Sequence, residues 1–149
     1  MSITETLNQD MKSALRAGNK IELGALRMAL AAIKKQEIDS RQALTDASVI
    51  SLLGKLIKQG HEARELFETA GRAELATKEA AEITIYERYL PAALSDAEVD
   101  ALIEQAIDTT GANSIKDMGR VMATIKSKAT GRVDMGAIST RVRKALSTD

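Results

Sequence analysis

Apolar residues recur at alternating spacings of three and four along most of the chain, which is the pattern of amphipathic α-helices. The most regular example lies in the second predicted helix: Leu23, Leu26, Leu30 and Ile33. Before the single proline, Pro91, the pattern predicts four helices, at about 3–17, 20–39, 46–70 and 73–90. The third contains Gly60 in its interior, and the pattern leaves open whether that helix is continuous there.

After Pro91 the same period predicts three shorter helices, at about 96–110, 115–129 and 135–146. Ser95 and Glu98 form a capping-box pattern at the start of the first. Ser114 and Asp134 are placed to cap the other two. The residues expected to face inward in the last helix are Ile138, Val142, Ala145 and Leu146.

The composition favours the same helical reading. Aromatic residues make up 2% of the chain, so few of the residues that favour strands are present. Apolar residues make up 44%, enough to form a core. We therefore predict an all-α fold, with an N-terminal domain of about four helices over 1–91 and a C-terminal three-helix module over 92–149.

Several classes of protein are excluded by what the sequence lacks. Without cysteine there can be no disulfide and no cysteine-ligated metal site. No apolar run approaches the roughly 18 residues of a membrane span. The residues after Met1 lack the charged and apolar segments of a secretory signal. We therefore expect a cytoplasmic protein that has no membrane partner and no cofactor.

The net charge is zero, but the two signs separate toward the C-terminus. All five charged residues within 92–111 are acidic, whereas 112–146 contains eight bases and two acids. On helical wheels the bases of the last two helices lie outside the apolar arcs, so they face solvent if these helices form a hairpin. Such a face suits a phosphate backbone. The candidate nucleic-acid-binding residues are Lys116, Arg120, Lys126, Lys128, Arg132, Arg141, Arg143 and Lys144.

A structural explanation competes with this one. Amphipathic helices place charges outside, and the acids of helix 96–110 can pair with the bases. The module has no aromatic residue on which to stack bases, so any RNA would be recognised by backbone and shape. In the turn 131–134, Gly131 ends a helix, Val133 can pack on the next, and Asp134 caps it. Arg132 is the one residue there without a structural role.

No complete set of catalytic residues can be found. His61, the only histidine, lies beside Glu62 and Glu65 but at the edge of an apolar stripe, as ordinary structural histidines do. The carboxylates form no distinct i, i+3 or i, i+4 cluster within an apolar face. No second imidazole is available for a metal, and no Gly-rich phosphate loop follows a strand. We therefore assign no catalytic residue and no metal ligand.

Several motifs resemble the GatB/YqeY family, and the resemblance extends over nearly the whole chain. The matching segments are Leu26-Arg27-Met28, Ala31-Ala32-Ile33-Lys34, Ala70-Gly71-Arg72, Glu87-Arg88-Tyr89-Leu90-Pro91, Lys116-Asp117-Met118-Gly119-Arg120-Val121-Met122 and Gly131-Arg132-Val133-Asp134. The chain is identified as a stand-alone YqeY-like member. The resemblance implies an N-terminal helical domain and a C-terminal domain similar to the tail of the tRNA-dependent amidotransferase B subunit, which helps to hold tRNA.

The resemblance also implies a carbon–nitrogen ligase with glutamine as amido-nitrogen donor, although the large core domain that performs this chemistry in the amidotransferase has no counterpart here. Three hypotheses follow. The first is a non-catalytic module that binds tRNA, or a tRNA-processing or amidotransferase complex, through the basic C-terminal domain. The second is a protein–protein adaptor that uses the long N-terminal helices, with Gly54 and Gly60 allowing close approach. The third is ligase activity itself.

Overall fold

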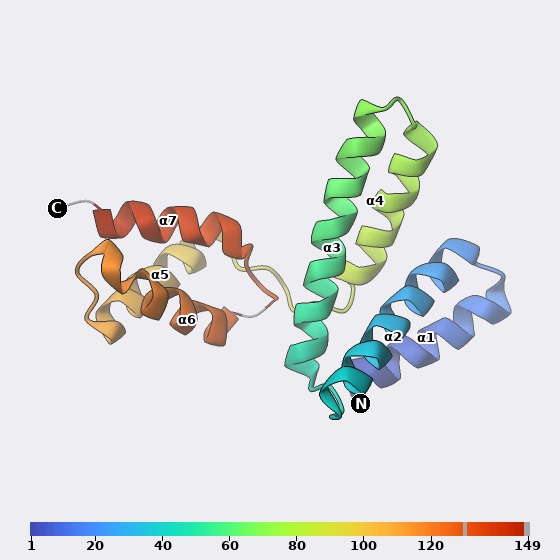
Figure 1. Ribbon diagram of the computed structural model, residues 1–149, viewed down its shortest axis with the longest axis horizontal. Coiled ribbons are helices and arrows are strands. Elements are labelled where there is room, and N and C mark those ends of the chain that lie inside the picture. The colour runs from blue at the N-terminus through green and yellow to red at the C-terminus, as the bar shows by residue number, and fades with distance from the viewer. Residues whose placement is uncertain (130, 148–149) are drawn as a thin grey trace. The chain divides into compact units, whose positions relative to one another are not determined.

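The computed structural model describes residues 1–129 and 131–147. All regular structure in these ranges is helical, and they contain no strand, which confirms the predicted all-α fold. The chain forms two compact units, Met1–Leu90 and Pro91–Asp149 (Figure 1). Within the described ranges, no helix combines the length and the apolar character needed to cross a bilayer.

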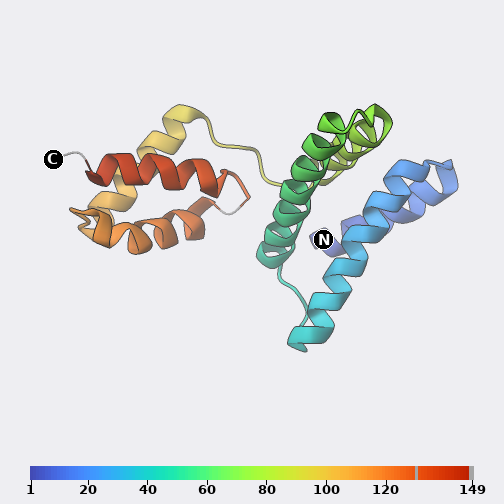
Figure 2. The same cartoon turned by 45° about the horizontal axis from the view of Figure 1, so that its top comes forward.

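The first unit consists of two helical hairpins, each a pair of antiparallel helices (Figures 1 and 2). Its helices are α1 (Ile3–Ala17), α2 (Lys20–Ser40), α3 (Asp46–Thr69) and α4 (Ala73–Glu87). The predicted capping box is present at α1, where the Ser2 hydroxyl accepts from the backbone N–H of Glu5 and the Glu5 carboxylate accepts from that of Ser2. Thr45 caps α3 through its side chain.

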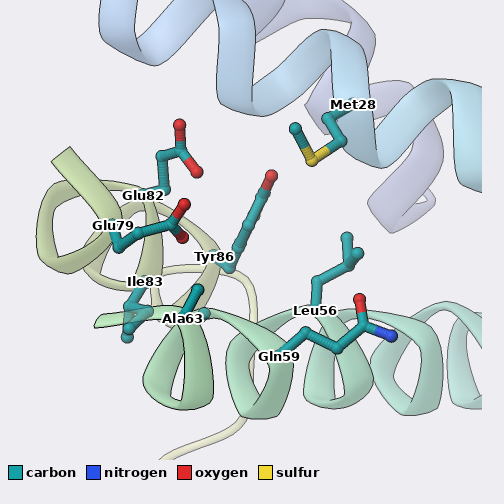
Figure 3. Close-up of a pocket in the computed structure, with 9 residues that line it drawn as sticks. Met28, Leu56, Gln59, Ala63, Glu79, Glu82, Ile83 and Tyr86 are labelled. Carbon is teal, nitrogen blue, oxygen red and sulfur yellow. The ribbon is translucent and has the colours of Figure 1, made fainter. Parts of the chain in front are cut away.

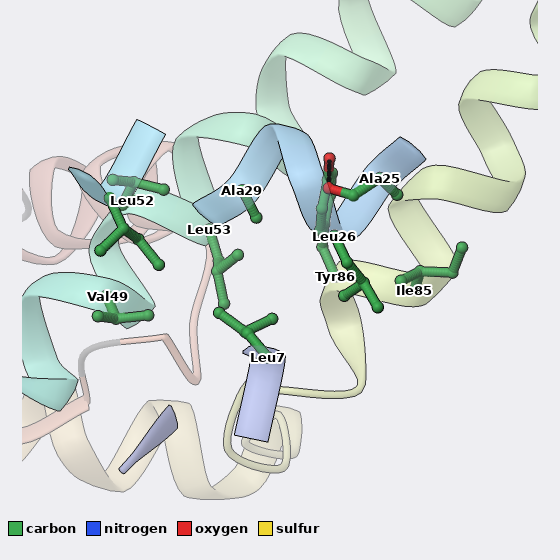
Figure 4. Close-up of a cluster of buried hydrophobic side chains, with 10 residues drawn as sticks. Leu7, Ala25, Leu26, Ala29, Val49, Leu52, Leu53, Ile85 and Tyr86 are labelled. Atoms are coloured by element: carbon green, nitrogen blue, oxygen red, sulfur yellow. Dashed lines mark hydrogen bonds between the residues drawn. The ribbon is translucent and has the colours of Figure 1, made fainter. Parts of the chain in front are cut away.

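The two hairpins share an aliphatic core with one aromatic residue in it. Tyr86 of α4 is 3% exposed, and its hydroxyl donates to the backbone carbonyl of Ala25 in α2 at 2.9 Å. Figure 4 shows Tyr86 beside Leu26, with Leu7 of α1 and Leu53 of α3 in the same cluster. The bond satisfies the buried phenol, which would otherwise lose its hydrogen bond to water. The buried members of the cluster are Leu7, Ala25, Leu26, Ala29, Ile33, Val49, Leu52, Leu53, Ile85 and Tyr86.

Helix α4 ends at Glu87, three residues before the predicted end at Leu90. Pro91 disfavours helical backbone at the preceding residue, so the chain leaves the helix through tighter i, i+3 turns. This exit lets the Tyr89 hydroxyl donate to Asp10 of α1 at 2.5 Å. Arg88 pairs with Glu22 of α2 at 2.8 Å. The Glu87–Pro91 motif therefore fastens α4 to the first hairpin.

Helix α3 continues through Gly60 without a break, which settles the question that the sequence leaves open. A Cβ atom at Gly60 would lie 2.9 Å from Cγ1 of Ile83, so the glycine lets α4 approach α3 closely. Gly54, six residues earlier in α3, has open space around it. Of the two glycines, Gly60 is thus occupied by an intramolecular contact and only Gly54 remains accessible.

The second unit is a three-helix module with a core of its own. Its elements are α5 (Asp96–Thr110), the 3₁₀ turn η1 (Ile115–Asp117), α6 (Met118–Ala129) and α7 (Met135–Ser147). Helices α6 and α7 form an antiparallel hairpin against α5 (Figure 2). The buried cluster is Val99, Ile103, Ala106, Val121, Ile125, Ile138, Val142 and Leu146. Ser95 with Glu98 caps α5, and Asp134 accepts from the N–H of Gly136 at the start of α7.

Two details of this unit differ from the prediction. Ser114 makes no side-chain cap; instead, the Asp117 carboxylate accepts from the backbone N–H of Asn113 at 3.1 Å, and a 3₁₀ turn precedes α6. Ala145 is exposed rather than inward-facing. The buried line of α7 follows a strict spacing of four through Val142 and Leu146, and Ala145 falls beside it.

Substituting alanine at the two glycines of α3 separates helix propensity from packing. Gly54→Ala should raise the free energy of unfolding by up to about 1 kcal/mol, because it removes backbone entropy without a clash. Gly60→Ala gains the same propensity but crowds Ile83, so it should be less stable than Gly54→Ala by about 1–3 kcal/mol. Urea unfolding measures both. Equal stabilities, or a Gly60→Ala penalty that persists in an Ile83→Ala background, would contradict the close approach.

Candidate functional site

The structure divides the eight predicted nucleic-acid-binding residues into two groups. Six of them are exposed on the second unit, and only Arg132 and Arg141 are partly buried; the exposed residues are Lys116, Arg120, Lys126, Lys128, Arg143 and Lys144. Within the described part of the chain, Lys116, Lys128, Arg143 and Lys144 form no ion pair and their side chains make no hydrogen bond. These four cations are therefore available to an external anion.

Arg132, for which the sequence suggests no structural role, has a clear one. It is half-buried, and its Nε donates to the backbone carbonyl of Ala92 at 2.9 Å. Its own carbonyl accepts from the N–H of Leu94 at 3.0 Å. These two bonds hold the start of the second unit against the turn between α6 and α7, so the conformation of Arg132 is set by folding rather than by a ligand.

Arg120 and Arg141 are also engaged within the module. Arg120 pairs with Asp117 at 2.6 Å and donates to the carbonyl of Thr110. That guanidinium is the main reason why the pKa of Asp117 is lowered. Arg141 bonds to Asp100 and lies 4.0 Å from Asp96 of α5. Two acids of α5 thus pair with Arg141 of the basic face, as the competing explanation predicts.

The available cations gather at the two ends of the α6–α7 hairpin. Because the helices are antiparallel and η1 contacts α7, Lys116 lies at the same end as Arg143 and Lys144. Lys128 lies at the opposite end, near the turn into α7. The 12 residues of α6 place these ends roughly 18 Å apart, at 1.5 Å per residue. A single ligand touching both would have to be an extended polyanion.

A second candidate site is a pocket of about 200 Å³ in the first unit, formed by α2, α3 and α4. Figure 3 shows Glu79 and Glu82 projecting from α4 on one side of the Tyr86 ring, with Met28 of α2 on the other. The remaining lining comes mainly from α3 and is mostly apolar. The lining residues are Met28, Leu56, Gln59, Gly60, Ala63, Glu79, Glu82, Ile83 and Tyr86.

Glu82 is the buried charged residue of this pocket, at 9% exposure. In the described ranges its carboxylate has neither a hydrogen-bond donor nor a cationic partner, and the same holds for Glu79. Burial, and then the neighbouring charge of Glu79, raise the pKa of Glu82. Burial and the same two carboxylates raise the pKa of Tyr86 to about 12, so the phenol stays protonated and keeps its bond to Ala25.

The sequence pattern did not lead us to predict this pair. Glu79 and Glu82 are three positions apart and are followed at the same helical spacing by Ile83 and Tyr86, so all four share one face of α4. They form an i, i+3 carboxylate pair next to an apolar stripe, so the prediction that the carboxylates form no such cluster was wrong. By contrast, His61 is half-buried and lies outside the pocket lining, while Glu62 and Glu65 are exposed. Across the described residues, no three acidic or histidine side chains come together as a metal site.

Comparison with known proteins gives consistent matches along the chain. The sequence model of a family described as "Yqey-like protein" matches residues 4–146. The chain is 31% identical to altered inheritance of mitochondria protein 41, mitochondrial, from Pyrenophora tritici-repentis, over 94% of this chain and 78% of the relative. It is 33% identical to the protein of the same name from Eremothecium gossypii, with the same coverage. With the Kluyveromyces lactis protein of that name it shares 38% identity over 68% of this chain and 56% of the relative.

The names of these relatives contradict the predicted cytoplasmic location, because each is called a mitochondrial protein. The prediction was wrong because it relied on the missing segments of a secretory signal. Mitochondrial import uses a different kind of segment, amphipathic and rich in arginine, on which that test does not bear.

Replacing Arg132 should weaken the second unit, whereas replacing an available cation should not. Arg132→Ala removes the bond to Ala92, which should lower the free energy of unfolding by about 0.5–1.5 kcal/mol. Arg143→Ala, which removes the same charge from the surface, should stay within about 0.5 kcal/mol of the parent. Urea unfolding followed at the amide signals of the second unit checks both. A stable Arg132→Ala would show that the turn does not need its guanidinium.

Replacing Glu82 should stabilise the protein in a pH-dependent way. With the pKa of Glu82 raised in the folded state, the unfolded chain loses this proton first as pH rises above the ordinary value of 4.5, so stability falls through the interval up to the folded pKa. Glu82→Gln mimics the protonated form. Its melting temperature should exceed that of the parent at neutral pH and match it below pH 4.5. Glu65→Gln, at an exposed position of α3, should show no such crossover.

Proposed function

The chain belongs to the YqeY-like protein family, and from this premise we propose that it is a non-catalytic helical module that binds tRNA, alone or within a tRNA-processing complex, through its second unit. The observation that carries the proposal is the set of four available cations on η1, α6 and α7. Charged side chains held at a surface without internal partners can exchange their counterions for phosphates, which is the main source of affinity for a nucleic-acid backbone.

The arrangement of the cations favours a structured RNA. Lys116, Arg143 and Lys144 at one end of the hairpin, and Lys128 at the other, suit phosphates separated across a groove rather than one isolated phosphate. No aromatic residue occurs after Tyr89, so the second unit offers no stacking platform for unpaired bases. The resemblance of this part to the tRNA-holding tail of an amidotransferase subunit supports the same choice of ligand.

An adaptor role is the second candidate, favoured by one specific observation. Helix α2 exposes three large apolar residues, Ile21 at 44%, Met28 at 53% and Ile38 at 66%. At 100° per residue, Ile21 and Ile38 lie away from the buried Leu26 and Ile33, and Met28, between them, also lines the pocket described above. A partner helix could cover this row. Gly54 remains open for close approach, but Gly60 is already filled by Ile83.

The RNA proposal predicts a strong and localised salt dependence. If four to six phosphates are contacted, the logarithm of the association constant for tRNA should fall with that of salt at a slope of about −3 to −5. Replacing Lys116, Lys128, Arg143 and Lys144 together by alanine should remove about one unit of slope per residue. Fluorescence anisotropy with full-length tRNA at several salt concentrations measures both quantities.

The matched control removes the same charge from the first unit. Lys34, Lys35, Lys55 and Lys58 are exposed on α2 and α3, so their replacement by alanine changes the net charge equally and should leave the slope unchanged. Equal losses in the two variants would mean nonspecific attraction and would overturn the assignment of the site. If tRNA does not bind at all while a protein partner is retained after nuclease treatment, the adaptor role replaces the RNA role.

A further inference from the structure

The pocket of the first unit holds two carboxylates that form no ion pair with any side chain of the described ranges. Glu82 is 9% exposed, and its carboxylate makes no hydrogen bond or ion pair within the described ranges, although the nearby charge of Lys78 partly offsets that of the carboxylate. Glu79 lies one turn away on the same face of α4, so the negative charge of each carboxylate makes ionisation of the other less favourable. Buried carboxylates are ordinarily hydrogen-bonded or paired. The carboxylate oxygens remain accessible from the pocket, so a positive charge supplied from outside can pair with them.

The walls of the pocket determine what kind of cation fits. Leu56 and Ala63 of α3, with Ile83 and Tyr86 of α4, give it an apolar lining beside the carboxylates. Its volume of about 200 Å³ is below the roughly 300–1,000 Å³ of pockets that hold drug-sized ligands. A short methylene chain that ends in an ammonium group suits this pocket. It is small, its methylene groups can pack on the apolar walls, and its charged head can contact a carboxylate.

A bare metal ion fits less well. Calcium takes six to eight oxygen ligands, and magnesium demands a near-octahedral set. The pocket offers two carboxylates and the amide of Gln59, while other lining side chains, such as Leu56 and Ile83, are apolar and cannot act as ligands. An anion is excluded by the sign of the charge. An organic cation uses both the carboxylates and the apolar wall.

We propose that this pocket binds a primary alkylammonium group, with Glu82 and Glu79 receiving the ammonium head and Leu56, Ile83 and Tyr86 contacting the alkyl stem. The group is either a free alkylamine or the side chain of a lysine in another protein. The ammonium group of the ligand then pairs with ionised Glu82, which forms no ion pair within the described chain. The proposal concerns the first unit alone and does not rest on RNA binding by the second.

Titration of the isotope-labelled full-length chain with n-pentylammonium, followed by NMR, tests the proposal. Saturable shifts should appear at the amides of Gly60, Ala63 and Ile83, and 1-pentanol, which has the same stem without the charge, should not produce them. Glu82→Gln should weaken binding about tenfold or more, since it removes a charge-assisted hydrogen bond. Glu65→Gln removes the same charge from an exposed site of α3 and should leave the affinity unchanged.

A second variant tests whether binding needs the space of the pocket as well as its negative charge. Ala63→Leu keeps both carboxylates but fills the space beside them, and it should abolish the shifts. Comparison of n-pentylammonium with N-acetyl-lysine-N-methylamide identifies the source: tighter binding of the former indicates a free amine, and of the latter a protein lysine. Equal shifts with 1-pentanol, no saturable shift with either amine, or equal affinities of Glu82→Gln and Glu65→Gln would overturn the proposal.

Discussion

The first unit depends on the hydrogen bond from the Tyr86 hydroxyl to the carbonyl of Ala25 and on the aliphatic side chains that exclude water from it. Each helical hairpin could form locally, but only contacts between the hairpins make them one body. Tyr86 supplies the single buried aromatic ring at that junction, in a chain with almost no others. Arg88 and Tyr89 then add two polar ties from the end of the same helix to α2 and α1. The sequence motif Glu87–Pro91 is therefore explained by assembly of the unit.

The same helix also carries the unit's least favourable feature. One turn before Tyr86, Glu82 is buried without a partner, next to a second carboxylate. A glutamine or an aliphatic residue would fill the position without the desolvation cost of a charge. Destabilising carboxylates and stabilising apolar residues thus share one face of α4, and the carboxylates line a pocket. An unpaired negative charge beside an apolar wall is the basis of the proposed ammonium site.

Most of the fold could be predicted from the sequence because helix ends are decided locally. The capping boxes of Ser2 and Ser95, and the start of α7 at Asp134, follow from the residues themselves. The errors occur where distant contacts compete with local signals. After the end of α4, the Tyr89 hydroxyl donates to Asp10, 79 residues away in the sequence. Before α6, the carboxylate of Asp117, rather than the side chain of Ser114, accepts a backbone hydrogen bond. The pocket was missed for the same reason, since burial of Glu82 arises only when α2 and α3 pack around α4.

Charge counting alone could not have identified the basic site correctly. Eight bases look equivalent on a helical wheel, yet three arginines are committed to the fold by guanidinium bonds to Ala92, Asp117 and Asp100. The geometry of arginine suits such fixed bonds to carbonyls and carboxylates, whereas lysine presents a mobile point charge. Three of the four available cations are lysines: Lys116, Lys128 and Lys144. The module therefore uses arginine mainly to hold its own shape, and lysines make up most of its unpaired surface charge.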